Sequence, residues 1–129
     1  MANYCPGADF FGPAFVKDFQ FWIYSDGYAT ILPESGGLVW GGFWMINADH
    51  LEELDKYEGV PQGCYFREVL PVITSFASEG DTPLDAWIYF STDTVRGKAR
   101  PGYMESVMEG ARDCRLPKEY LPVLESWLV

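Results

Sequence analysis

The first two thirds of the chain alternate strand-forming runs with turn residues, and this pattern restricts the fold more than any other feature. Residues 15–24 and 38–46 are dense in aromatic and β-branched side chains, which favour strands. The same reasoning predicts shorter or more polar strands at residues 28–32, 65–74 and 84–91. A sheet of short strands therefore comes first in the chain.

Breaks between these runs are marked by glycine, proline and small polar residues. We expect loops at residues 33–37 and 77–81, since both stretches are rich in turn-forming residues. Gly41 and Gly42 interrupt a predicted strand, which indicates a bulge, a barrel-like bend, or the close approach of another group.

A first helix is predicted between residue 47 and Gly59. Asp49 with Glu52 has capping-box spacing, and Asn47 is an alternative cap. Gly59 is placed to end the helix, so Glu58 falls in its last turn or just beyond.

The last third of the chain changes to helical spacing. Tyr103, Val107 and Ala111 are four residues apart after Pro101, and a final short helix is predicted at residues 118–127. Pro122 inside that helix requires a first-turn position or a kink. We predict an α+β fold with a small mixed, barrel-like sheet and surrounding helices, formed by residues 1–129 as a single domain.

The charge balance excludes one class of partner. Nine Lys and Arg stand against 19 Asp and Glu, which gives a net charge of −10. Such a surface repels phosphate backbones, so we expect no nucleic-acid binding. No run of apolar residues is long enough for a membrane span and no signal peptide is visible, so we expect a cytoplasmic protein without a membrane partner.

The sequence also gives little support for metal binding or for nucleophilic catalysis. The cysteines Cys5, Cys64 and Cys114 are widely spaced and have no CxxC pair, so we expect reduced, mostly packed thiols and no metal site. His50 is the single histidine, and a solvated helix position is the simpler reading for it. The GxSxG, GxxxxGK[ST] and GxGxxG motifs are absent from the sequence.

Glu58 is the strongest candidate for chemistry. It lies beside a helix-ending glycine and is flanked by Tyr57, Val60 and Pro61, which can hold a carboxylate in a partly apolar setting. Desolvation of that kind raises the pKa of a glutamate and makes it a usable general acid and base. A glutamate in a last helical turn is, however, more often simply solvated.

The segment around Glu58 resembles a family signature. Residues 54–61 read LDKYEGVP, which is similar to the LDxYEGxP signature of the γ-glutamylcyclotransferase-like (AIG2-like) family. Other stretches match that family's patterns in the same order along nearly the whole chain, at residues 5–14, 29–31, 39–44, 65–67, 89, 101–103 and 110–120.

The resemblance implies an activity and a site. It implies an enzyme that cyclises a γ-glutamyl group of a small-molecule substrate to 5-oxoproline and releases the attached amine, without a cofactor. It carries the general acid and base over to Glu58. Tyr65, Tyr89, Tyr103 and Gly41 are the candidates for substrate binding. Each tyrosine has a structural alternative, as a core aromatic residue whose hydroxyl bonds to backbone.

Arg67 is a further substrate-binding candidate. It follows Tyr65 in a Tyr-x-Arg segment that the family shares, and an arginine can hold a substrate carboxylate. A surface ion pair is the alternative and more usual role for it.

One part of the family pattern is missing. Relatives carry an N-terminal strand that ends in a YGSN-like loop, and this sequence begins at Met1 just ahead of the CPxA stretch that follows it. The departure has three explanations: a natural start upstream, which we expect; completion of the site by another chain; or a non-catalytic relative. An unpaired sheet edge in such a chain also allows a homo-oligomer.

Two rival functions stay open at this point. A binding or interaction protein with the same fold and no turnover is the alternative to the enzyme. An unrelated small α+β domain with chance similarity is the other.

Overall fold

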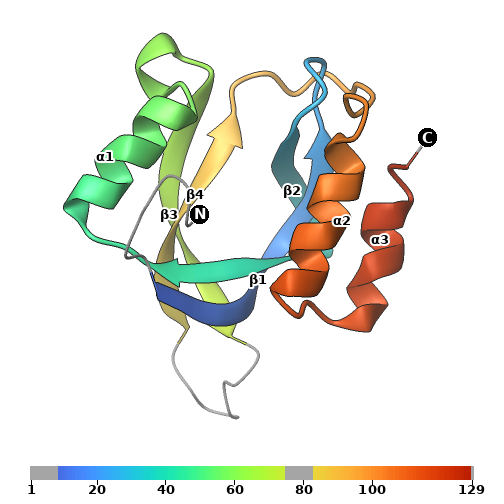
Figure 1. The fold of residues 1–129 in the computed structure, drawn as a ribbon, viewed down its shortest axis with the longest axis horizontal. Coiled ribbons are helices and arrows are strands. Elements are labelled where there is room, and N and C mark those ends of the chain that lie inside the picture. The colour runs from blue at the N-terminus through green and yellow to red at the C-terminus, as the bar shows by residue number, and fades with distance from the viewer. Residues whose placement is uncertain (1–8, 75–82, 129) are drawn as a thin grey trace.

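The computed structural model describes residues 9–74 and 83–128. The CPxA stretch at the N-terminus and the predicted loop at residues 77–81 lie outside the described residues. Within the described part, four strands form one sheet and three α-helices pack beside it (Figure 1).

The two longest strands form an antiparallel hairpin. β1 (Asp9–Ile23) pairs with β2 (Ala29–Met45) along nearly its full length. Asp18 adopts a left-handed backbone with φ of 68°, and the register jumps there, from Lys17 opposite Leu38 to Phe19 opposite Pro33. The stretch predicted as a loop between two strands is therefore a bulge inside one strand, so the predicted break at residues 33–37 is wrong.

The sheet has the order β2-β1-β3-β4 and is antiparallel at every pair. β3 (Tyr65–Thr74) and β4 (Leu84–Ser91) have the bounds that the sequence predicts. β1 and β3 pair only at Ala14 with Thr74 and Phe15 with Ile73, so the sheet bends between its two halves. The sheet is not closed, and β2 and β4 are its edges.

The two edge strands meet at one end. The backbone N–H of Ser91 in β4 donates to Oγ1 of Thr30 in β2 at 2.9 Å, and both residues are buried. Breaking this bond would leave buried polar groups without a partner, which would lower the stability of the fold.

The first helix begins as one of the two capping options predicts. α1 (Ala48–Tyr57) is capped by Asn47, whose Oδ1 accepts from His50 N–H at 2.8 Å, while His50 Nδ1 accepts from Asn47 N–H at 3.2 Å. His50 therefore completes a reciprocal capping box, a more specific role than the solvated position expected for it. A short 3-10 helix, η1 (Val60–Gln62), leads on to β3.

The C-terminal helices cover the far side of the sheet from α1 (Figure 1). α2 (Tyr103–Asp113), the 3-10 turn η2 (Lys118–Tyr120) and α3 (Leu121–Glu125) pack around Ile23 of β1, which is fully buried. Pro122 lies in the first turn of α3, one of the two positions its sequence context allowed. The predicted α+β class is confirmed.

Candidate active site

Glu58 lies where α1 ends, and its position is fixed by the backbone around it. Its N–H donates to the Leu54 carbonyl at 2.9 Å, which closes the last helical turn. Gly59 then takes a left-handed conformation with φ of 70°, and a Cβ there would lie 3.1 Å from the Cβ of Cys64. The Gly59 carbonyl accepts the N–H groups of both Gln62 and Cys64 at 3.1 Å. Glycine is therefore needed for both its φ and its small size.

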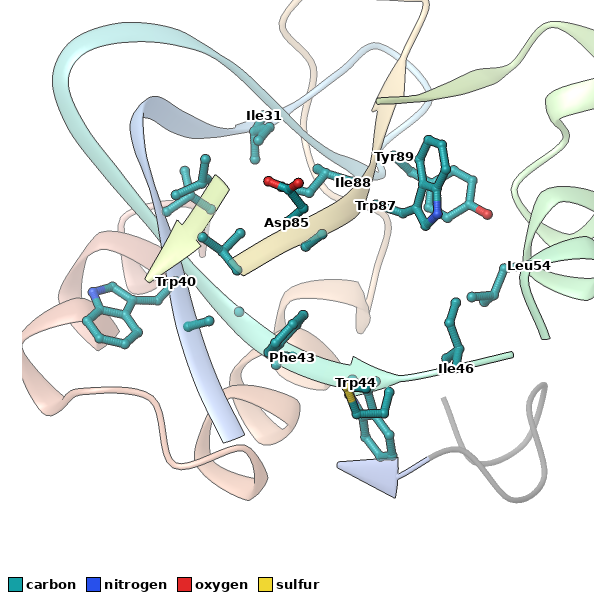
Figure 2. Close-up of a pocket in the computed structure, with 18 of the residues that line it drawn as sticks. Ile31, Trp40, Phe43, Trp44, Ile46, Leu54, Asp85, Trp87, Ile88 and Tyr89 are labelled. Atoms are coloured by element: carbon teal, nitrogen blue, oxygen red, sulfur yellow. The ribbon is translucent and has the colours of Figure 1, made fainter. Parts of the chain in front are cut away.

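A cavity of about 460 Å³ opens beside Glu58 (Figure 2). Its wall is mostly apolar and is formed by β2, β4, the middle of β1, Val72 of β3, and α1. Consecutive residues line it from Trp40 to Ile46 and from Asp85 to Tyr89. Successive strand residues point to opposite faces of a sheet. Because consecutive residues of both strands line the cavity, it lies against the edges of β2 and β4 and not only against one face of the sheet. Figure 2 shows labelled side chains of both strands, with Leu54 of α1 closing the same space.

The charged groups of the cavity wall are acidic. Glu58 and Asp85 line the cavity, while none of its lining residues is Lys, Arg or His. Burial raises the pKa of the Glu58 carboxyl above its ordinary value. A carboxyl tuned in this direction can take up and release a proton closer to neutral pH than an exposed glutamate can.

A group of tyrosines lies around Glu58. Burial is the main cause that raises the pKa of Tyr24, Tyr65, Tyr89 and Tyr103, and the charge of Glu58 contributes to the increase in all four. These phenols stay protonated at neutral pH, so each carries one O–H group that can donate a hydrogen bond.

Two of these tyrosines bond the backbone of one residue, Ala29, on either side of its Cα. The Tyr65 hydroxyl donates to the Ala29 carbonyl at 2.8 Å, and the Tyr103 hydroxyl accepts from the Ala29 N–H at 3.1 Å. Tyr24 is buried and shares a hydrogen bond with Tyr65. Bonding to backbone is the structural role that the sequence offered as the alternative for Tyr65 and Tyr103. Tyr65 and Tyr103 have this structural role and also lie close enough to Glu58 for its charge to raise their pKa.

Tyr89 and Arg67 converge on a different carboxylate, that of Asp55 in α1. The Tyr89 hydroxyl donates to Asp55 Oδ1 at 2.6 Å, and Arg67 Nε lies 2.9 Å from the same oxygen and 3.2 Å from Oδ2. The Arg67 guanidinium also lies 4.2 Å from the ring centroid of Trp87. Arg67 is thus engaged in an ion pair and a cation–π contact, and it is not among the cavity-lining residues.

The paired glycines of β2 have different surroundings. A Cβ on Gly41 would meet nothing within 4 Å, and Gly41 lines the cavity. A Cβ on Gly42 would lie 2.9 Å from Cys114 Sγ, so Gly42 permits a close approach of α2 to β2. Cys114 is half-buried, whereas Cys64 is exposed and does not fit the expectation of packed thiols.

The structure brings together some of the predicted site residues and separates others. Glu58, Tyr89 and Gly41 line the cavity, Tyr65 and Tyr103 lie near Glu58 outside the lining, and Arg67 is held by Asp55. The sequence reasoning missed Asp55 and Tyr24. Asp55 precedes Glu58 by three residues, a helical spacing that could have signalled it. Tyr24 ends an aromatic strand and carries no such signal.

The described residues contain no group of three or more His, Cys, Asp or Glu side chains placed to hold a metal ion. No helix within residues 9–74 and 83–128 is long and apolar enough to cross a membrane.

Sequence comparison finds relatives along most of the chain. Residues 38–124 match the AIG2-like family. The γ-glutamylcyclotransferase of Homo sapiens is 30% identical over 131 aligned residues, and that of Bos taurus is 29% identical over the same length. Each alignment covers 94% of this chain and 68% of the relative.

Structure comparison gives the same result. A solved γ-glutamyl cyclotransferase superposes with a TM-score of 0.85 at 28% identity, covering 98% of this chain and 78% of that one. YkqA from Bacillus subtilis superposes with a TM-score of 0.78 at 25% identity, covering 97% of this chain and 45% of that one.

Proposed function

Because the chain belongs to the AIG2-like family, we propose that it is a γ-glutamylcyclotransferase-type enzyme. Its substrate is a small γ-glutamyl compound, which it converts to 5-oxoproline with release of the attached amine. The observation that carries this proposal is the half-buried Glu58, whose pKa is raised beside a concave apolar cavity.

Glu58 acts as the general base and then as the general acid. The carboxylate accepts a proton from the α-amino group of the γ-glutamyl unit while that nitrogen attacks the γ-carbonyl carbon. The new C–N bond closes a five-membered ring. As the old amide bond breaks, Glu58 returns the proton to the departing amine. One titrating group suffices, because the nucleophile and the electrophile already belong to one molecule.

Tyr103 supports this chemistry as a hydrogen-bond donor. It accepts a bond from Ala29 N–H, so its own hydroxyl proton can be directed to a substrate oxygen. Tyr65 donates to the carbonyl of the same residue and helps to hold it in place. Tyr89 lines the cavity with its phenol held by Asp55, and Gly41 leaves room along the β2 wall. A donor placed like Tyr103 stabilises the negative charge of a tetrahedral intermediate.

A binding protein without turnover is the second candidate. It is favoured by the mostly apolar cavity wall, in which the hydroxyl of Tyr89 is already bonded to Asp55. In that case a γ-glutamyl compound occupies the same cavity and stays intact.

Two further features of the proposal concern the setting of the enzyme. We place it in the cytoplasm, where small γ-glutamyl metabolites are available to a reduced, acidic protein. The edges of β2 and β4 also allow a second copy to pair with the sheet, because edge strands present unpaired backbone groups.

The test is release of 5-oxoproline from a panel of γ-glutamyl amino acids and amines. Glu58→Gln keeps the shape of the side chain and removes its acid and base capacity, so turnover should fall by about 10²- to 10⁴-fold. Glu53→Gln is the matched control, since Glu53 lies on the same helix and is exposed. Equal turnover by the wild type and Glu58→Gln would remove Glu58 from the mechanism.

A second arm uses a version extended with a family-type YGSN strand. Activity of the extended form alone, lost with Glu58→Gln, supports the proposed chemistry and shows that this strand is required. Binding of γ-glutamyl compounds without turnover in either form supports the second candidate.

A further inference from the structure

Asp55 connects the helix that carries Glu58 to two strands of the sheet. Its carboxylate receives the hydroxyl of Tyr89 from β4 and the Nε of Arg67 from β3. The ion pair is substantially buried, with the Arg67 and Asp55 side chains 28% and 21% exposed. Bonds to a carboxylate in such a setting are stronger than those between neutral groups.

The two donors are held in register by the sheet itself. Arg67 and Tyr89 are directly opposite one another in the β3–β4 ladder, so their side chains leave the sheet side by side. Trp87 follows on the same face of β4, and the Arg67 guanidinium stacks over its ring. The sheet therefore presents a rigid pair of donors to one point on α1.

Two other ion pairs of α1 lie at its surface. Leu54 is its one buried residue among those described. Lys56 forms these exposed ion pairs with Glu52 and Glu53. Exposed pairs of this kind contribute little to holding a helix in place, whereas the part-buried bonds to Asp55 are directed and charge-assisted.

We propose that Asp55 is a positioning residue, which holds the end of α1 against β3 and β4 so that Glu58 stays in the wall of the cavity. Asp55 and Glu58 are three residues apart, so both lie on one side of the last turn and move together. The consequence for turnover rests on the proposed function, but the position of Glu58 can be measured without it.

The pKa of Glu58, measured from its carboxyl ¹³C resonance, shows whether the side chain stays buried. Burial raises its pKa, and it faces the phenols of Tyr24, Tyr65, Tyr89 and Tyr103. If α1 loses its anchor, Glu58 gains contact with water. Its pKa then falls toward the ordinary value of about 4.3.

The experiment is a carboxyl ¹³C NMR titration of Glu58 in the wild type and three variants. Asp55→Asn keeps the shape of the side chain and removes the charge that Arg67 needs, and we expect it to lower the pKa of Glu58. Tyr89→Phe keeps the Arg67 ion pair and removes one donor, so we expect a smaller shift in the same direction. Lys56→Gln is the control on the same helix, where only two exposed ion pairs are lost, and we expect no shift.

The outcomes separate this inference from the proposed function. An unchanged Glu58 pKa in both folded Asp55→Asn and folded Tyr89→Phe, with folding checked by tryptophan fluorescence, would overturn the positioning role. A lowered pKa in Tyr89→Phe, which changes no charge, supports it even when no form of the chain releases 5-oxoproline. In an active preparation, the acidic limb of the kcat/KM profile should move with the NMR pKa, which a purely structural role of Asp55 does not require.

Discussion

The two apolar clusters of the molecule differ in what covers them. Beneath α2 and α3, the side chains of Ile23, Met104, Met108 and Leu124 are at most 3% exposed. On the other side, Ala14, Val16 and Val72 form a second cluster, and all three also line the cavity. Apolar side chains thus form a sealed core where α2 and α3 cover the sheet, and a concave wall where α1 leaves a cavity.

The difference separates stability from binding. A sealed cluster gains the full transfer free energy of its side chains, since no water reaches them. A cavity wall gains less on folding, because part of its apolar surface stays available to a ligand. We therefore expect substitutions in the first cluster to affect unfolding and those in the second to affect binding.

The largest expected effect compares one isoleucine from each cluster. Ile23→Ala should lower the free energy of unfolding by about 2–5 kcal/mol, because it leaves a hole in a closed core. Ile88, which is half-buried and lines the cavity, should cost clearly less when changed to alanine. Urea denaturation of the two variants measures both values. Equal losses would mean that the two clusters are not energetically distinct.

The neighbouring glycines of β2 sharpen the comparison. Gly42→Ala brings a methyl group toward Cys114 Sγ and should destabilise the fold by about 1–3 kcal/mol through overpacking. Gly41→Val places its side chain in open cavity space, so stability should change little. The affinity of the Gly41→Val variant for a γ-glutamyl compound should fall by about tenfold or more, because the added side chain crowds the cavity. Calorimetry with both variants tests the pair, and a stable Gly41→Val with unchanged affinity would place the ligand elsewhere.

The smallest expected effect is a pH dependence that only the cavity side shows. The pKa of Glu58 is higher in the folded protein than in the unfolded chain, so the native state binds more protons in the window between the two values. The contribution of Glu58 to stability is therefore complete below about pH 4.3 and is lost as the pH rises through the folded pKa. Glu58→Gln should become progressively more stable relative to the wild type over that rise. Parallel stability curves from pH 4 to pH 8 would contradict the burial of this carboxyl.

Much of the fold could be predicted from local sequence. β3 and β4 begin and end at the predicted residues, because their aromatic and β-branched runs are bounded by turn residues. The break predicted at residues 33–37 failed for a non-local reason. That stretch remains strand, because β1 runs alongside it and takes up the irregularity at Asp18 with a left-handed residue.

The site was predictable only where the chain is contiguous. Glu58 was identified from the residues immediately around it and from the family signature. The partners of Arg67 and of Tyr65 were not identified, because they depend on how α1 and β2 lie against β3. Tertiary contacts of this kind leave no spacing pattern in one sequence.

The hydrogen bond from Ser91 to Thr30 has a mechanical consequence for the sheet. It fixes the distance between β2 and β4 at one end, while beyond it these strands border the cavity. The spacing of the two strands near Asp85 and Trp44 can therefore change without breaking a described β-ladder bond, since the ladders run through β1 and β3. The cavity can therefore widen at one end, while the end where Thr30 and Ser91 are bonded keeps its width.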